Sequence, residues 1–110
     1  MILVKESEIQ RQILNYLGKA GILHWRVCLG AVAGSGFRRS NPMKGHPDIA
    51  GVLKGGRYFA IEVKRPGKKV TWYPEQLEWR DRLSEAGVLY IAATSVDDVA
   101  KAFFEVRSAS

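Results

Sequence analysis

Two acidic residues and a lysine, spaced along a predicted hairpin, are the residues of this chain best suited to chemistry. Asp48 follows a proline in the stretch GHPDIAG, and Glu62 and Lys64 flank Val63 in YFAIEVK. Because side chains alternate along a strand, Glu62 and Lys64 point to one face and Val63 to the other. Two neighbouring carboxylates repel one another unless a hard cation such as Mg²⁺ binds both. The pattern therefore indicates a divalent metal site beside a lysine.

A pair of glycines at 55–56 predicts the turn that brings these residues together. It separates two apolar runs, 48–54 and 57–64, and glycine accepts the positive φ angles of tight hairpin turns. A turn centred between the two glycines pairs residues whose numbers add up to about 111, which places Asp48 opposite Val63. We therefore expect both acids and the lysine to meet at one end of the hairpin.

A lysine beside such a metal site suits hydrolysis of a phosphodiester better than sugar or peptide chemistry. The metal lowers the pKa of a bound water and stabilises charge on the phosphoryl oxygens. Lys64 is suited to hold the attacking water or a phosphate oxygen. Glycosidases also use two carboxylates, but the lysine and the basic surroundings fit a sugar poorly. The alternative is that Glu62 and Lys64 form a solvated strand end, because a bare E-x-K occurs by chance in many proteins.

Both helices and further strands are predicted around this hairpin. The predicted fold class is therefore α/β, with a mixed sheet flanked by helices. The order is helix, strand, strand, strand, helix, strand, helix, the last helix being capped by Thr94 or Ser95. A glycine-rich stretch over 30–45 is predicted to be a long mobile loop. The predicted elements cover residues 5–18, 22–29, 48–54, 57–64, 74–86, 88–93 and 95–104.

The size and charge of the chain narrow its class. Its 110 residues predict a single domain, and 17 Lys and Arg against 11 Asp and Glu give a net charge of +6, which favours a polyanionic partner. Charge alone does not separate nucleic acid, an anionic membrane surface and ribosomal contact. No stretch approaches the roughly 20 apolar residues of a membrane span. The single cysteine, Cys28, is expected to be a small buried hydrophobe. We expect a soluble protein in a reducing compartment.

Four segments of the chain resemble, in order, the VRR-NUC domain of the PD-(D/E)xK nucleases. They are ESEIQ from residue 6, GHPDIAGV, YFAIEVKRPGKKVTWYPEQLEWRDRL and GVLYIAATSVDDV. The resemblance implies a restriction-endonuclease-like core and one VRR-NUC domain over 1–110. It implies Mg²⁺ or Mn²⁺ bound by Asp48, Glu62 and the Val63 carbonyl, with Lys64 catalytic and Gln76 assisting from the following helix.

The family also carries an acid in the first helix, for which this chain offers Glu6 and Glu8. Glu6 shares a helix face with Gln10 and matches the pattern E-x-x-x-Q, so we favour Glu6 as a site acid and metal ligand, with Glu8 as the alternative. Either residue also fits a first-turn acid that is favoured only by the helix dipole.

Basic residues on two loops flank the predicted site and are suited to neutralise DNA phosphates. Trp72 or Tyr73 is suited to stack on an unpaired base, although aromatic residues near a helix also pack in cores. His46 fits either a phosphate contact or an incidental place in a turn, and His24 is expected to be structural. The predicted DNA-binding residues are Arg38, Arg39, Lys44, Arg65, Lys68 and Lys69.

The resulting hypothesis is a structure-specific DNA endonuclease that cuts branched DNA such as four-way (Holliday) junctions. A small domain has little surface for reading bases, so recognition of DNA shape is expected. The resemblance implies a homodimer, whose two-fold axis would match a two-fold junction, and a phage-encoded protein in the cytoplasm of a bacterial host. The alternatives are a non-catalytic nucleic-acid-binding module and an exonuclease or flap nuclease of the same fold.

Overall fold

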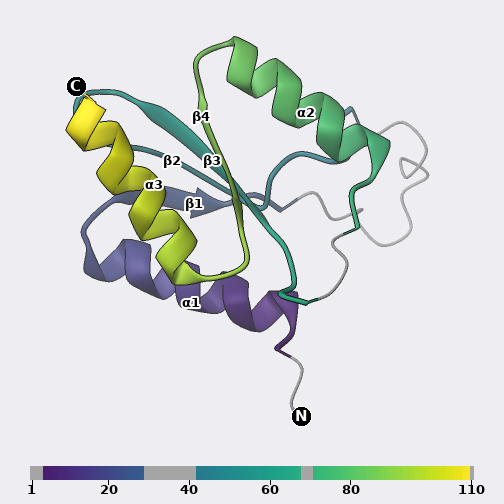
Figure 1. Cartoon of the computed structure of the whole chain (residues 1–110), viewed down its shortest axis with the longest axis horizontal. Coiled ribbons are helices and arrows are strands. Elements are labelled where there is room, and N and C mark those ends of the chain that lie inside the picture. The colour runs from purple at the N-terminus through teal and green to yellow at the C-terminus, as the bar shows by residue number, and fades with distance from the viewer. Residues whose placement is uncertain (1–3, 29–41, 68–70, 110) are drawn as a thin grey trace.

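The computed structural model describes residues 4–28, 42–67 and 71–109, which form a four-stranded mixed sheet and three helices (Figure 1). The predicted α/β class, with a mixed sheet and helices, is confirmed. The strands lie in the order β1-β2-β3-β4; the first two pairings are antiparallel and β3 pairs with β4 in parallel. The elements are α1 (Glu6–Lys19), β1 (Leu23–Arg26), β2 (Ile49–Val52), β3 (Tyr58–Val63), α2 (Pro74–Glu85), β4 (Leu89–Ala93) and α3 (Val96–Ala109).

One face of the sheet packs against α1 and α3 and forms the hydrophobic core. In α1, Ile9, Ile13 and Leu17 recur every four residues and are at most 2% exposed, as expected for a helix with one apolar stripe. The strands and α3 contribute Ile49, Phe59, Ile61, Val63, Ile91, Ala93, Val99 and Phe103. This packed face supplies the hydrophobic stabilisation of the fold.

The other face of the sheet carries α2, which covers it thinly. Figure 1 shows α2, in green, across the sheet from α1 and α3. Helix α2 contacts β4, and none of its residues is buried. Side chains alternate along β3, so Glu62 points to this face because Ile61 and Val63 point into the core. Glu62, and Lys64 just after the end of β3, therefore lie on the face that α2 covers.

The hairpin of β2 and β3 is shifted by one residue from the predicted register. Ile49 pairs with Ile61, so Asp48 stands opposite Glu62 rather than Val63. The reason is the loop, which holds the three residues 54–56 instead of two, and in which both glycines adopt positive φ angles of 96° and 92°. The glycine pair was correctly assigned to a turn, but its loop length was wrong.

The remaining helices and strands differ from prediction mainly at their ends. β1 is shorter than expected and ends at Arg26, while Cys28 is exposed rather than buried. α3 runs past the predicted end at Phe104 because no glycine or proline interrupts it. Its cap is Ser95, whose Oγ accepts a hydrogen bond from the Asp98 backbone N–H (3.3 Å). Most of the predicted loop over 30–45 lies outside the described residues.

The helices of the described ranges are α1, α2 and α3. None of them is long and apolar enough to cross a membrane.

Candidate active site

Asp48 is anchored at the open end of the hairpin, immediately before β2. Its Oδ2 accepts a hydrogen bond from the Val63 backbone N–H (2.8 Å), and its carbonyl oxygen accepts one from the Val27 N–H (2.8 Å). The preceding Pro47 is fully buried, and its ring restricts the backbone that leads into the strand. The Asp48 carboxylate therefore lies at the end of β3 in spite of the shifted register.

Glu62 is a buried acid whose two oxygens have different surroundings. The residue is 3% exposed. Its Oε2 accepts a hydrogen bond from Gln76 Nε2 (3.3 Å), whereas Oε1 is buried without a partner among the described residues. Burial and then the nearby charge of Asp48 raise the pKa of the Glu62 carboxyl to about 8, and the charge of Lys64 opposes this shift. The isolated chain thus holds a proton at this site near neutral pH.

Lys64 is buried as well, at 5% exposure. Its Nζ donates to the Thr71 carbonyl oxygen (2.7 Å) and to Gln76 Oε1 (2.7 Å), and it lies 4.5 Å from the centroid of the Trp72 ring. Its backbone N–H donates to the Ala93 carbonyl oxygen (2.8 Å), which extends the pairing of β3 with β4. Within the described ranges no carboxylate lies within 4.0 Å of Nζ. Neutral acceptors and an aromatic face therefore surround this cation.

Gln76 joins the lysine to the buried acid. It is the third residue of α2, which opens with Pro74 at the position where a missing N–H costs nothing. Its Oε1 accepts from Lys64 Nζ and from the Tyr73 backbone N–H (3.1 Å), while its Nε2 donates to Glu62. A single amide thus fixes the positions of a cation and a carboxylate from opposite sides. Asp48, Glu62, Lys64 and Gln76 are brought together.

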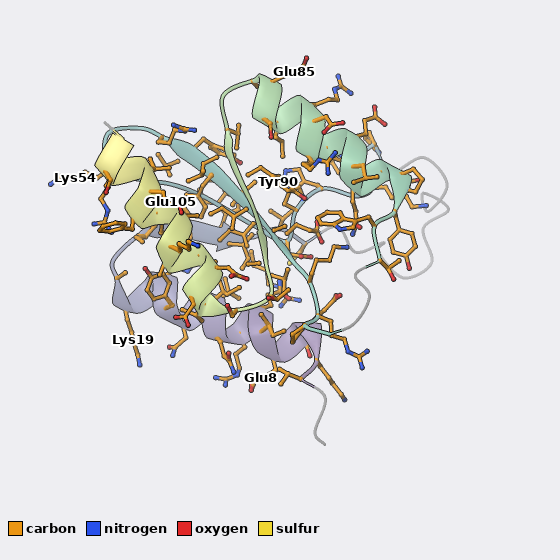
Figure 2. All side chains as sticks on the ribbon, in the orientation of Figure 1. Glu8, Lys19, Lys54, Glu85, Tyr90 and Glu105 are labelled. Carbon is orange, nitrogen blue, oxygen red and sulfur yellow. The ribbon has the colours of Figure 1, made fainter. Side chains whose placement is uncertain are left out.

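The two candidate acids of α1 have different surroundings. Glu8 accepts two hydrogen bonds from Arg11 (2.7 and 2.9 Å), which lower the Glu8 pKa, and Figure 2 shows it projecting from the outer side of α1. Glu6 is exposed, but its charge adds to the raised pKa of Glu62, after burial and the charge of Asp48. Glu6 is therefore within electrostatic reach of the buried acid, whereas Glu8 is paired with Arg11, so we continue to favour Glu6.

The basic residues and histidines near the site are only partly described. Lys44 Nζ lies 3.8 Å from Glu75 Oε2, and Arg65 is exposed just after β3. His46 Nδ1 donates to the Pro47 carbonyl oxygen (2.8 Å), and its ring meets the Trp79 ring edge-on at 4.8 Å. These contacts suit a structural residue. The predicted DNA-binding residues Arg38, Arg39, Lys68 and Lys69 lie outside the described residues.

Two features of the site were not predicted. The Trp72 ring faces the Lys64 ammonium, whereas the sequence suggested base stacking or core packing; only its place four residues before Gln76 hinted at the site. The Tyr90 hydroxyl is buried without a partner among the described residues, and Figure 2 shows Tyr90 between β4 and α2. Burial and then the charge of Glu62 raise the pKa of Tyr90. No sequence pattern distinguished this tyrosine.

The donors at this site fit a hard divalent cation. The unpartnered Oε1 of Glu62 and the adjoining Asp48 carboxylate are the hard oxygen ligands that Mg²⁺ prefers, and the Val63 carbonyl would add a third. Among residues 4–28, 42–67 and 71–109, no three His, Cys, Asp or Glu side chains gather into one metal-binding group. Glu6 thus does not complete a preformed cluster, and waters would fill the remaining positions, as is usual for Mg²⁺.

Comparisons of the chain with protein-family models, with curated proteins and with solved structures found no match.

Proposed function

We propose that this protein is a metal-dependent nuclease that hydrolyses phosphodiester bonds in DNA, on a core of the restriction-endonuclease type. One observation carries the proposal: the paired carboxylates of Asp48 and Glu62 adjoin Lys64, and Gln76 bonds to both Glu62 and Lys64. A buried acid whose pKa is raised by burial and by a neighbouring carboxylate, next to a buried lysine, is more typical of a functional site than of a packing arrangement.

Each residue has a distinct part in the proposed chemistry. A bound Mg²⁺ or Mn²⁺ would supply an activated water and would neutralise charge on the phosphoryl group. Asp48 and Glu62 would hold it through their carboxylate oxygens, with the Val63 carbonyl beside them. Lys64 places a positive charge next to the reacting phosphate and favours the ionised form of Glu62.

Gln76 and Glu6 support this arrangement from the two flanking helices. The Gln76 amide keeps the Lys64 ammonium and the Glu62 carboxylate at fixed positions, which matters because small misplacements of reacting groups slow catalysis strongly. Glu6, at the start of α1, adds negative charge near the buried acid. It would help to attract the cation through an intervening water.

The proposed substrate is branched DNA, above all four-way junctions, cut by a homodimer in the bacterial cytoplasm. The net charge of +6 suits a polyanion, and the small domain leaves little surface for reading bases. A two-fold protein would present two sites to a two-fold junction. Sedimentation equilibrium tests the dimer directly, and a monomer at the concentrations used for cleavage would contradict it.

Cleavage assays test the proposal with labelled four-way junctions, flaps and plain duplexes in Mg²⁺, Mn²⁺ or EDTA. We expect metal-dependent cutting of branched DNA by the wild type, and loss of cutting in Asp48→Asn and Lys64→Met. Lys19→Met, at the exposed end of α1, is the control and should cut normally. Circular DNA that resists cutting would indicate an exonuclease. Salt-dependent binding without cutting under any metal would instead indicate a non-catalytic binding module.

A further inference from the structure

Trp72 lies against the catalytic lysine of the proposed site instead of in the core. The Lys64 Nζ stands 4.5 Å from the centroid of the Trp72 ring, within the range in which an ammonium is attracted by the negative face of an aromatic ring. The ring is half-buried, whereas its neighbours Thr71 and Tyr73 are exposed. Trp72 is thus the residue of this segment that turns toward the site.

The attraction is strengthened by the burial of Lys64. An ammonium has three N–H donors, and two of them bond to the Thr71 carbonyl and to Gln76 Oε1. Lys64 is only 5% exposed, so its ammonium has little water around it. The Trp72 ring therefore replaces part of the stabilisation that water would give to the charge. Cation–π contacts gain in strength when water is excluded in this way.

The backbone on both sides of Trp72 is tied to the same site. Thr71 accepts a hydrogen bond from Lys64 through its carbonyl oxygen, and the Tyr73 N–H donates to Gln76 Oε1. Gln76 in turn accepts from Lys64. The backbone is therefore anchored to the site on both sides of Trp72, which keeps the base of its side chain close to the lysine. Two hydrogen bonds and the ring contact together limit the directions that the Lys64 ammonium can take.

We propose that Trp72 is a positioning residue, whose ring fixes the Lys64 ammonium beside Glu62 for the reaction. The inference rests on the proposed function only where it speaks of catalysis. It also gives Trp72 a different task from stacking on an unpaired base, because the face of the ring toward the site is already taken by the lysine. A base-stacking residue would act on DNA affinity, and a positioning residue acts on the rate of the chemical step.

The contact can be tested without any DNA. Protons above an aromatic ring resonate upfield, so the Lys64 Cε and Nζ protons should be shifted upfield from those of the other lysines in NMR spectra of the full chain. The shift should vanish in Trp72→Leu and persist in Trp25→Leu, which removes a tryptophan on β1 that contacts Tyr58 instead. An unshifted Lys64 in the folded wild type would overturn the inference and leave the proposed nuclease untouched.

Kinetics on branched DNA then separate positioning from base stacking. We expect Trp72→Leu to lower kcat about tenfold and Trp72→Phe to lower it less, with KM nearly unchanged, because the cation–π attraction weakens in that order. A raised KM with an unchanged kcat would overturn the inference in favour of base stacking. Trp25→Leu should match the wild type in both constants.

Fluorinated tryptophans at position 72 provide a test that does not depend on removing the ring, so a loss of folding does not complicate its result. Each added fluorine weakens the negative face of the ring with little change in its size. Both kcat and the upfield shift of the Lys64 signal are measured on the same proteins. We expect log kcat to fall stepwise as fluorines are added. An equal kcat throughout the series, with the Lys64 signal still shifted, would show that the ring only fills space and would overturn the inference.

Discussion

Glu62 is the buried group whose protonation we expect to control the stability of the metal-free protein. Its pKa is about 8 in the folded chain, through burial first and the charge of Asp48 second, against an ordinary value of 4.5. Between these two values the folded protein keeps a proton on Glu62 that the unfolded chain releases. The free energy of unfolding therefore falls as pH rises through this window, and the contribution is fully present only below about pH 4.5.

The magnitude follows from the size of the shift. Each pKa unit corresponds to about 1.36 kcal/mol, so the difference between 4.5 and about 8 amounts to a loss on the order of 3–5 kcal/mol by pH 8. Because Glu62 is only 3% exposed, solvent screening reduces this value little. The total free energy of unfolding of a small domain is only about 5–15 kcal/mol. The metal-free protein should thus be marginally stable in mildly alkaline solution.

Glu62→Gln is the variant that isolates this effect, since glutamine has nearly the same shape and does not titrate. Urea denaturation in EDTA should give similar stabilities for both proteins near pH 4.5 and a growing advantage for Glu62→Gln up to about pH 8. Glu78→Gln, an exposed acid of α2 in an ion pair with Arg82, is the matched control and should follow the wild type. Parallel curves for wild type and Glu62→Gln across the whole range would refute the reasoning.

Divalent metal, Tyr90 and Gly45 offer three further tests. Mg²⁺ at 100 times its Kd should stabilise the wild type at pH 8 by about 2.7 kcal/mol, because it binds only the folded chain; an equal rise in the Tm of Glu62→Gln would place the metal elsewhere. Tyr90→Phe should raise the free energy of unfolding by up to about 1 kcal/mol, since its buried hydroxyl has no partner among the described residues; a loss in urea denaturation would mean that the hydroxyl bonds to water. Gly45→Ala should slow DNA cleavage roughly tenfold or more, because a Cβ there would come within 2.8 Å of the Gln76 backbone nitrogen. Gly55→Ala, also at positive φ but facing open space, is its control for backbone strain, and equal cleavage rates in the two variants would contradict the prediction.

The local part of the site was predictable because a single hairpin creates it. Asp48, Glu62 and Lys64 are joined by one short connection, and side-chain alternation along a strand follows directly from its geometry. The register was wrong by one residue because a glycine pair marks a turn without saying whether its loop holds two residues or three. The side chain of Asp48 bridges that difference by accepting the Val63 N–H.

The non-local part of the site had no comparable signal in the sequence. Gln76 reaches Glu62 and Lys64 only because of the way α2 lies across the sheet, and it was named through a family resemblance rather than from spacing. Trp72 fitted base stacking and core packing equally well from sequence, since both favour an aromatic residue. Its contact with Lys64 depends on the folded positions of two separate segments.

One face of the sheet provides most of the apolar packing, and the other face carries the residues of the proposed chemistry. The face under α1 and α3 is closely packed with apolar residues, whereas α2 buries none of its own residues over the other face. A buried carboxylate with an unpartnered oxygen destabilises a fold, and an apolar residue of similar size would often be more stable at that position. Burial of the ionisable groups of Glu62 and Lys64 therefore destabilises the fold at one place, and the apolar packing on the opposite face offsets this loss of stability. Such a confined inconsistency is expected at a functional site, and this is the physical reason to begin experiments at Glu62.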